Sequence, residues 1–296
     1  MRGAALILPG RSDQNVPLKG LVLWGIVGAF LVFPSLLRLD PYRVHLDAIL
    51  VSPTYAHPLG TDENGRDVLT RLLCASRGTL GIGCAGAAIA VALGAGGGVL
   101  AGYLGGAPDT LLMRLVDISL AFPSLFVILL ASAVFPPGMI PLIALIGLTG
   151  WMPVARMVRG SVRELIAGSS IEAARALGAT GRWIIRRHLV PQVRGVLFVM
   201  ALVQLNRAIL AEATISFLGF GIQPPAPTWG NMLIGAQGYV YTAPWVAIAP
   251  GLAITVTLLA IQWLGVGRVI EPSVQCRQAR QGEPRSRTGK ATPSRV

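Results

Sequence analysis

The feature that most constrains this chain is a series of apolar runs, each close to the length that a helix needs to cross a lipid bilayer. Apolar residues make up 53% of the chain and charged residues only 13%, unlike a typical soluble domain. Because backbone polar groups in lipid must be satisfied within the segment, such runs form helices. We therefore predict an all-α membrane protein with six transmembrane helices, from the runs at 18–37, 77–104, 111–135, 139–158, 195–220 and 245–266.

These runs predict how the chain is divided. Residues 1–17 precede the first transmembrane helix at 18–37, and a polar segment follows at 38–76. The run at 18–37 could also be a signal peptide, but no small-residue cleavage site follows it, which favours a span that is retained. Residues 77–268 then form a core of five transmembrane helices, and we expect the basic tail at 269–296 to be disordered.

The arginines and lysines predict the orientation. Of the 25 basic residues, 19 lie in the N-terminal segment, the turn near residue 110, the loop around 155–194 and the tail. Five lie on the opposite side and one, Arg207, lies inside a span. The positive-inside rule therefore places both termini and the 155–194 loop in the cytoplasm, and the 38–76 segment outside.

The second apolar run contains a regular stripe of small residues. Small residues every fourth position lie along one helix face, where they allow another transmembrane helix to approach closely. Flexible, scattered glycines are the alternative, but lipid forces the backbone to remain hydrogen-bonded. We predict helix packing through Gly86, Ala90, Gly94, Gly98, Gly102 and Gly106.

A polar stretch within the 159–192 loop predicts a helix–turn–helix. Ser169 and Glu172 have the spacing of a capping box, so we expect a helix to begin at Ser169 and to end at Gly178. Thr180 is then placed to cap a second helix, which we expect Pro191 to end. This is either a loop whose arginines lie at the lipid headgroups or a docking element for another protein.

This stretch resembles the cytoplasmic EAA loop of permease subunits of bacterial ABC importers. The resemblance implies a coupling helix that binds a groove of the ATPase subunit. His188 and Val190 stand where that family usually has Ile and Leu. The residues carried over to ATPase coupling are Glu172, Ala173, Ala174, Arg175, Gly178 and Pro191.

Two further stretches narrow the resemblance. In residues 57–69, Thr61 is placed to cap a short interfacial helix on the outer face. This stretch and residues 212–233 resemble the C-type permease subunit of dipeptide, oligopeptide and nickel importers. The resemblance covers most of residues 57–265, although Val266 stands where the family usually has Asp.

Two ionisable residues in or near the fifth run are candidates for a pore or gate. Charges inside a membrane usually mark a functional pathway, and Arg207 and Glu212 are separated by only five positions. A local ion pair between them is the alternative, and Glu212 could also reach the outer interface. Asp117 is expected to cap a helix or to pair locally.

Other functional classes are disfavoured. The net charge of +12 does not come with the basic and aromatic pattern of a nucleic-acid interface. Two outer histidines, His45 and His57, lack the clustered partners of a metal site. Lys290 lacks the glycine pattern of a phosphate-binding loop, and we find no catalytic constellation, which also argues against an intramembrane enzyme.

The resemblance implies an ABC type I importer permease fold in the bacterial inner membrane, with alternating access driven by ATP. The implied partners are a homologous second permease subunit, two ATPase subunits, an extracytoplasmic solute-binding protein and membrane lipid. ATP and Mg²⁺ would be bound by the ATPases, so no cofactor is expected here. Dipeptides or oligopeptides are the expected solutes, nickel or another small solute is the alternative, and a self-sufficient secondary transporter is a rival architecture.

Overall fold

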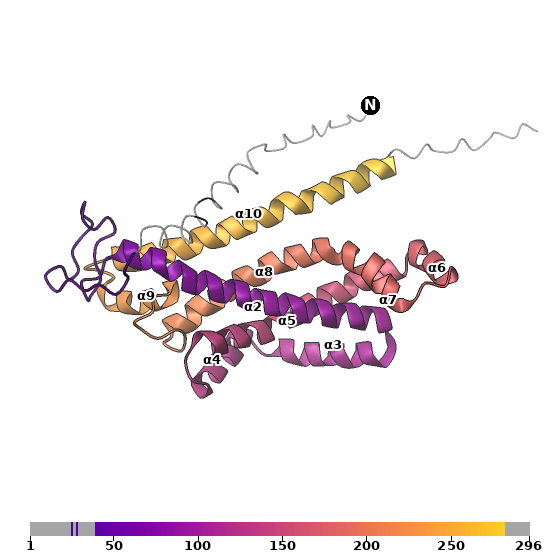
Figure 1. Cartoon of the computed structure of the whole chain (residues 1–296), viewed down its shortest axis with the longest axis horizontal. Helices are drawn as coiled ribbons and strands as arrows, with labels where there is room; N and C mark the ends of the chain where they lie inside the picture. The colour runs from indigo at the N-terminus through magenta and orange to yellow at the C-terminus, as the bar shows by residue number, and fades with distance from the viewer. Residues whose placement is uncertain (1–24, 26–27, 29–38, 282–296) are drawn as a thin grey trace, which may run out of the picture.

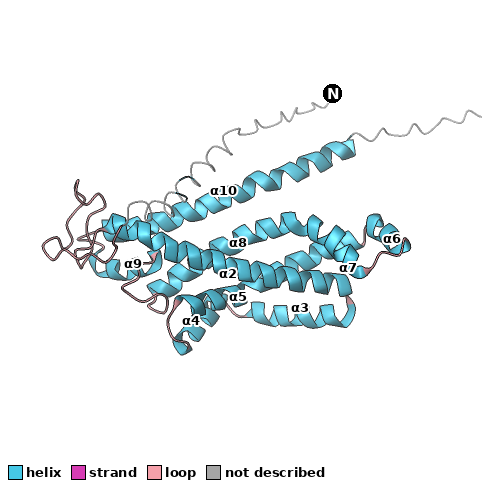
Figure 2. Cartoon of the chain, viewed as in Figure 1, coloured by secondary structure: helices cyan, strands magenta, loops and turns pink. Residues whose placement is uncertain are grey.

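The computed structural model describes Gly25, Gly28 and residues 39–281, with side chains up to Leu264. The predicted first span at 18–37 therefore lies almost wholly outside the described residues, as do residues 1–17 and 282–296. The described part is helical, and its only β pairing is one isolated bridge between Thr61 and Asp67 (Figure 2). Its helices are α2 Val68–Leu104, α3 Gly106–Ala121, α4 Ser124–Val134, α5 Met139–Ile166, α6 Ser169–Ala176, α7 Gly181–Ile184, the π-helix η1 Ile185–Leu189, α8 Val190–Phe217, α9 Trp229–Ala236, the 3₁₀-helix η2 Gln237–Tyr239 and α10 Trp245–Gln281.

The long helices form an elongated bundle (Figure 1). α2 packs most extensively against α5 and next against α8, α10 runs along one side, and α3 and α4 lie on another. The short helix α9 and the 39–67 segment lie at one end, here called the α9 end, while α6 and α7 lie at the other, here called the α6 end. Four of the described helices are long and apolar enough to span a membrane, and the bent pair α3 and α4 makes a fifth if it counts as one span.

The small-residue stripe of α2 faces a second stripe on α5. An added Cβ at Gly86 would lie 2.8 Å from Ile146 Cγ2, and one at Gly102 would lie 2.8 Å from Val162 Cβ. The residue numbers of the contacting pairs increase together along α2 and α5. The two helices therefore run parallel, in one constant register. The pairs are Gly86 with Ile146, Ala90 with Gly150, Gly94 with Val154, Gly98 with Val158 and Gly102 with Val162. Gly106 is the exception, since an added Cβ there meets nothing within 4 Å.

α2 begins nine positions before the predicted start of the second span at residue 77. Asp67 is its N-cap and accepts a hydrogen bond from the Thr70 N–H at 2.8 Å. The predicted short helix after Thr61 is wrong. Thr61 is fully buried, and its hydroxyl donates to the Ala48 carbonyl oxygen at 2.5 Å and accepts from the Val51 N–H at 2.8 Å. These long-range bonds hold Thr61 in the isolated β bridge with Asp67, so Thr61 does not cap a helix.

The predicted third span is broken. α3 and α4 are bent by 81° at Phe122 and Pro123, where both residues have extended backbone. Proline disfavours helical conformation in the residue before it, which explains why α3 ends at Ala121. The predicted turn near residue 110, between the runs at 77–104 and 111–135, is largely helical, because α3 already begins at Gly106.

Two predicted helix ends are wrong as well. Pro191 does not end the second helix of the polar loop, because α7, η1 and α8 form one uninterrupted helical segment from Gly181 to Phe217. Proline is tolerated within the first turn of a helix, and the π turn immediately before α8 breaks the regular hydrogen-bond register there. α10 continues to Gln281, so part of the tail predicted to be disordered is helical.

Candidate functional site

At the α6 end, the short helix α6 is attached to the bundle through one apolar side chain. Ile171 is fully buried, in a cluster that also contains Val162 at the end of α5 and Ile184 of α7. The predicted capping box is wrong, because Gly168 is the N-cap and no side chain caps the helix. Most of the remaining α6 surface is exposed, including Glu172. Packing therefore holds this helix in place and leaves its outer face available.

The predicted end of α6 at Gly178 is confirmed. Gly178 has a φ of +82°, and its N–H donates to the Arg175 carbonyl oxygen at 2.9 Å. The Ala179 N–H donates to the Ala174 carbonyl oxygen at 3.0 Å. These two bonds form a Schellman motif, in which the residue after the C-cap adopts a left-handed conformation that glycine accepts without strain.

A shallow hollow lies between α6 and α7. It has a volume of about 610 Å³. Leu177 is 89% exposed at its edge and Trp183 is 48% exposed. Exposed large apolar groups beside a rigid turn are typical of a protein-binding surface. The hollow is lined by Ser170, Ala173, Ala174, Leu177, Gly178, Ala179, Thr180, Trp183 and His188.

Among the predicted coupling residues, the structure brings Glu172, Ala173, Ala174, Arg175 and Gly178 onto α6 and its end. It does not bring Pro191 there, since this residue lies in the first turn of α8. The Arg175 guanidinium lies 5.9 Å from the centroid of the Tyr103 ring. Tyr103 also lies against Gly181, so the end of α2 contacts both sides of the α6–α7 turn.

An ion-pair cluster near the α6 end was not found by sequence reasoning. Asp109 of α3 is 3% exposed at its side chain and pairs with both Arg159 and Arg163 of α5. Its Oδ2 accepts from Arg159 Nη2 at 2.8 Å. Asp117 pairs with Arg156 in an exposed position, as expected for a local pair. The arginine spacing on α5 was the available indication, because positions four apart share one helix face.

The alternative interpretation of Arg207 and Glu212, a local ion pair, is wrong. Five positions rotate a residue by roughly 140° around a helix, so the two side chains leave α8 on different faces. Arg207 Nη2 donates to Ser124 Oγ of α4 at 2.5 Å. Glu212 is fully buried and accepts from Ser216 Oγ at 2.8 Å, so it does not reach the outer interface either.

Arg207 lines a cavity of about 220 Å³ between α2, α4, α5 and α8. Ala87 and Ala90 contribute small side chains to its wall, and Ser124, Thr149 and Gln204 contribute polar groups. Glu212 is not among the lining residues. The structure therefore separates the two pore candidates, since Arg207 lines this cavity and Glu212 does not.

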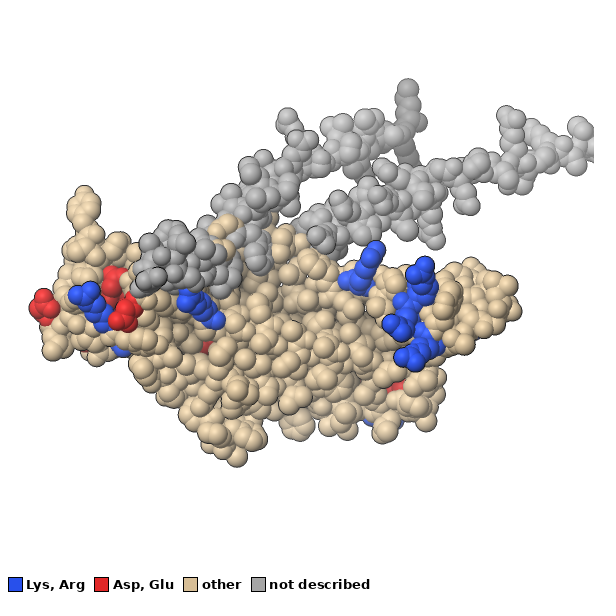
Figure 3. Space-filling view, viewed as in Figure 1, with Lys and Arg blue, Asp and Glu red and all other residues tan. Residues whose placement is uncertain are grey.

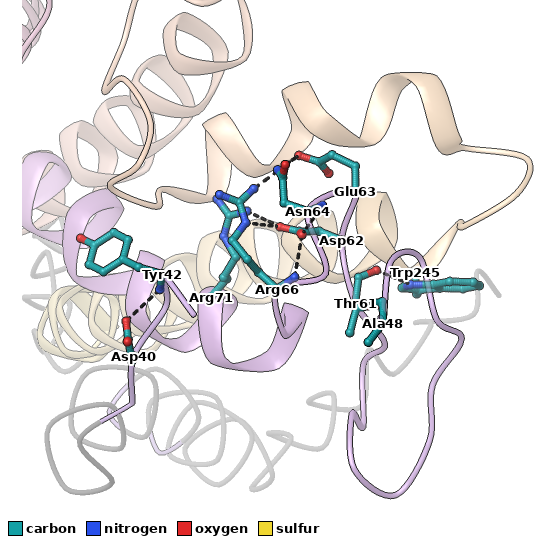
Figure 4. Close-up of polar contacts among 10 residues, drawn as sticks. All are labelled: Asp40, Tyr42, Ala48, Thr61, Asp62, Glu63, Asn64, Arg66, Arg71 and Trp245. Atoms are coloured by element: carbon teal, nitrogen blue, oxygen red, sulfur yellow. Dashed lines mark hydrogen bonds and ion pairs between the residues drawn. The ribbon is translucent and has the colours of Figure 1, made fainter. Parts of the chain in front are cut away.

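At the α9 end, a buried carboxylate organises the segment before α2 (Figure 4). Asp62 is 3% exposed and pairs with Arg66, whose Nε donates to Asp62 Oδ2 at 2.8 Å, and with Arg71. The backbone N–H groups of Asn64 and Arg66 both donate to Asp62 Oδ1 at 2.9 Å. Trp245 at the start of α10 donates to the Thr61 carbonyl oxygen at 3.2 Å. Two arginines and two backbone amides thus compensate one buried charge.

The two outer histidines lie near this cluster. Their ring centroids are 6.4 Å apart, and His57 Nδ1 lies 3.0 Å from Asp67 Oδ1. Among the side chains of residues 39–264, no group of three or more His, Cys, Asp or Glu has the arrangement of a metal site. His57 therefore interacts with the N-cap residue of α2.

Comparison with known proteins identifies the bundle. A family model described as "Binding-protein-dependent transport system inner membrane component" matches residues 94–274, which cover more than half of the chain. The chain belongs to this family. It is thus a permease subunit of a binding-protein-dependent ABC importer and is not itself an enzyme. Like other members, it is a component of the inner membrane.

Several relatives share most of this permease. The chain is 36% identical to the oligopeptide transport system permease protein OppC of Haemophilus influenzae over 71% of its own length and 68% of that protein. It is 36% identical to the glutathione transport system permease protein GsiD of Pectobacterium atrosepticum, over 75% and 73% of the two chains. It is 35% identical to the di/tripeptide transport system permease protein DppC of Pseudomonas aeruginosa, over 82% of each chain.

A solved structure shares the permease fold. A chain of the MetNI methionine ABC transporter, solved in inward-facing conformations, superposes with a TM-score of 0.56 at 22% sequence identity. The superposition covers 69% of this chain and 96% of that one. Charged side chains of this permease gather towards its two ends on the face drawn in Figure 3, and uncharged residues cover most of the middle. This distribution is typical of a protein that spans a bilayer.

Proposed function

We propose that this permease carries peptides, and that it spans the membrane six times with its α6 end in the cytoplasm. Relatives named for oligopeptide, glutathione and di/tripeptide transport support the solute class. The predicted span at 18–37, the bent pair of α3 and α4, and the four long helices together make six spans. The excess of arginine around 155–194 supports the orientation.

The α6 hairpin, defined here as residues 169–184, is the proposed coupling element that binds an ATPase subunit. The observation that carries this proposal is the way in which the hairpin is attached to the bundle. Ile171 is fully buried in the bundle, while Leu177 is 89% exposed at the far end of the hairpin. An element fixed on one side and open on the other transmits a movement of its partner to the spans. Glu172 is exposed and has no side-chain partner in the described part of the chain, so it is free to bond a partner protein.

The remaining proposed partners are those that a binding-protein-dependent ABC importer needs. A homologous second permease subunit would cover the large exposed apolar side chains of α3 and α4, such as Leu111 and Leu130, where lipid does not. Two ATPase subunits would bind ATP and Mg²⁺ and drive alternating access of the spans. An extracytoplasmic solute-binding protein would deliver the peptide at the α9 end.

The coupling proposal is tested with two substitutions in the α6 hairpin. Gly178→Val places a β-branched residue in the left-handed region, which costs roughly 1–2 kcal/mol locally. Glu172→Ala removes only an exposed carboxylate. Neither change should unfold the bundle, so we expect normal membrane levels, less co-purified ATPase and reduced uptake of a labelled tripeptide. Glu164→Ala, an exposed residue of α5 outside the hollow, is the matched control and should retain both association and uptake.

Two outcomes would contradict this proposal. Full uptake by both hairpin variants would leave the 169–184 segment as a loop at the headgroups. Uptake of nickel but not of the tripeptide by the unmodified transporter would refute the solute class without affecting the coupling element.

A further inference from the structure

The cavity beside Arg207 contains a positive charge deep inside a span. Arg207 lies ten residues before the end of α8 at Phe217, or about 15 Å along the helix axis. Its guanidinium is partly buried and donates to Ser124 Oγ at 2.5 Å. The same arginine, with Ser124 and Thr149, also lines an adjoining hollow of about 400 Å³. The charged group therefore lies between two spaces that a solute can occupy.

No acidic side chain in residues 39–264 forms an ion pair with Arg207. Asp109 and Asp117 pair with arginines of α5, and Glu212 accepts from Ser216. Glu164, the acidic residue of α5, is exposed near the end of that helix and forms no ion pair with Arg207. A charge at membrane depth is expensive unless it faces water, a counter-ion or a substrate path. Arg207 thus has no acidic partner among the side chains of residues 39–264, and it faces a cavity.

A second polar side chain in the cavity, Gln204, lacks a hydrogen-bond partner among the described side chains. Gln204 is 3% exposed and lines the same cavity, one helical turn before Arg207. Its amide has no hydrogen-bond partner among residues 39–264, although buried amides are normally bonded. Ser124 adds a hydroxyl at the first residue of α4, where the helix N-terminus favours negative charge. Together these groups offer donors and positive charge to a ligand.

We propose that this cavity is a carboxylate-binding subsite on the translocation path, in which Arg207 binds the anion and Gln204 and Ser124 position it. Guanidinium binds carboxylate through two parallel hydrogen bonds, and a dry site strengthens them. A volume of about 220 Å³ suits the end of a solute and not a whole peptide. The inference rests on the proposed peptide function, and it names the terminal carboxylate as the recognised group.

The test compares two peptides of the same shape in the complete reconstituted transporter. Trialanine has a terminal carboxylate, whereas trialanine amide does not. We expect Arg207→Gln to lower uptake of trialanine relative to its amide by roughly 10-fold to 100-fold, as for loss of a charged hydrogen bond. Arg207→Lys should restore part of the preference. Arg194→Gln, on the exposed surface of α8, is the matched control and should leave the ratio unchanged.

An equal loss of uptake for both peptides in Arg207→Gln would overturn the inference, because Arg207 would then have a structural role only. If the unmodified transporter takes up neither peptide, the peptide function fails and a binding assay decides the subsite. In that assay, Leu125→Cys in a background without the three native cysteines reports on the cavity through its alkylation rate. If acetate but not acetamide slows alkylation of this cysteine, and does so only when Arg207 is present, the result would support the subsite. If acetate does not slow alkylation, the inference would be overturned.

Discussion

Replacing Gly98 by alanine tests the packing of α2 against α5 with a single methyl group. The added Cβ would lie 2.6 Å from the Ala155 carbonyl oxygen and 2.8 Å from Val158 Cβ. Carbon atoms pack at about 3.5–4.0 Å, so the neighbouring atoms must move by roughly 1 Å. A carbonyl oxygen and a Cβ cannot rotate away, so the helices themselves must separate. Overpacking of this kind costs about 1–3 kcal/mol.

Gly96→Ala is the matched control on the same helix. Gly96 is exposed, and a Cβ there meets nothing within 4 Å. Alanine also favours a helix over glycine by about 1 kcal/mol in water, so this variant should be as stable as the unmodified chain or more stable. Stability is measured as the fraction of intact complex that remains after heating in lipid nanodiscs, by size-exclusion chromatography. Equal heat resistance of Gly98→Ala and Gly96→Ala would refute the close contact.

The remaining predictions concern topology and the buried carboxylate. A cysteine at Gln223 should react with a membrane-impermeant maleimide added to cells whose outer membrane has been permeabilised, whereas one at Leu177 should not; labelling of the Leu177 site would reverse the proposed orientation. Asp62→Asn should destabilise the complex by about 3–5 kcal/mol, because it leaves Arg71 buried without its partner, and thermal stability should fall accordingly. Asp117→Asn removes an exposed pair and should change stability by at most about 1 kcal/mol, and a similar loss in both variants would contradict the argument.

Local chemistry in the sequence determined several features of this permease. Apolar run length predicts spans because lipid offers no hydrogen bonds to the backbone, and α5, α8 and α10 lie where those runs are. The end of α6 was predictable because a left-handed residue after a helix is nearly always glycine, and Gly178 has that conformation. The four-residue spacing of small residues on α2 also marked the face that packs, from Gly86 to Gly102.

Tertiary structure decided how those elements meet. Hydropathy placed the start of α2 too late, because the buried charge of Arg71 is compensated by Asp62, which lies outside the helix in a segment folded back on it. The residues of α5 that contact the α2 stripe, from Ile146 to Val162, also recur every fourth position. A spacing within one helix marks a face of that helix, but it does not specify which other helix packs against that face. The sequence left open whether Arg207 and Glu212 line a pore or form an ion pair. Helix rotation and the position of α4 direct Arg207 to Ser124, away from Glu212. Contacts between distant segments depend on the three-dimensional arrangement of whole helices, which local propensity does not encode.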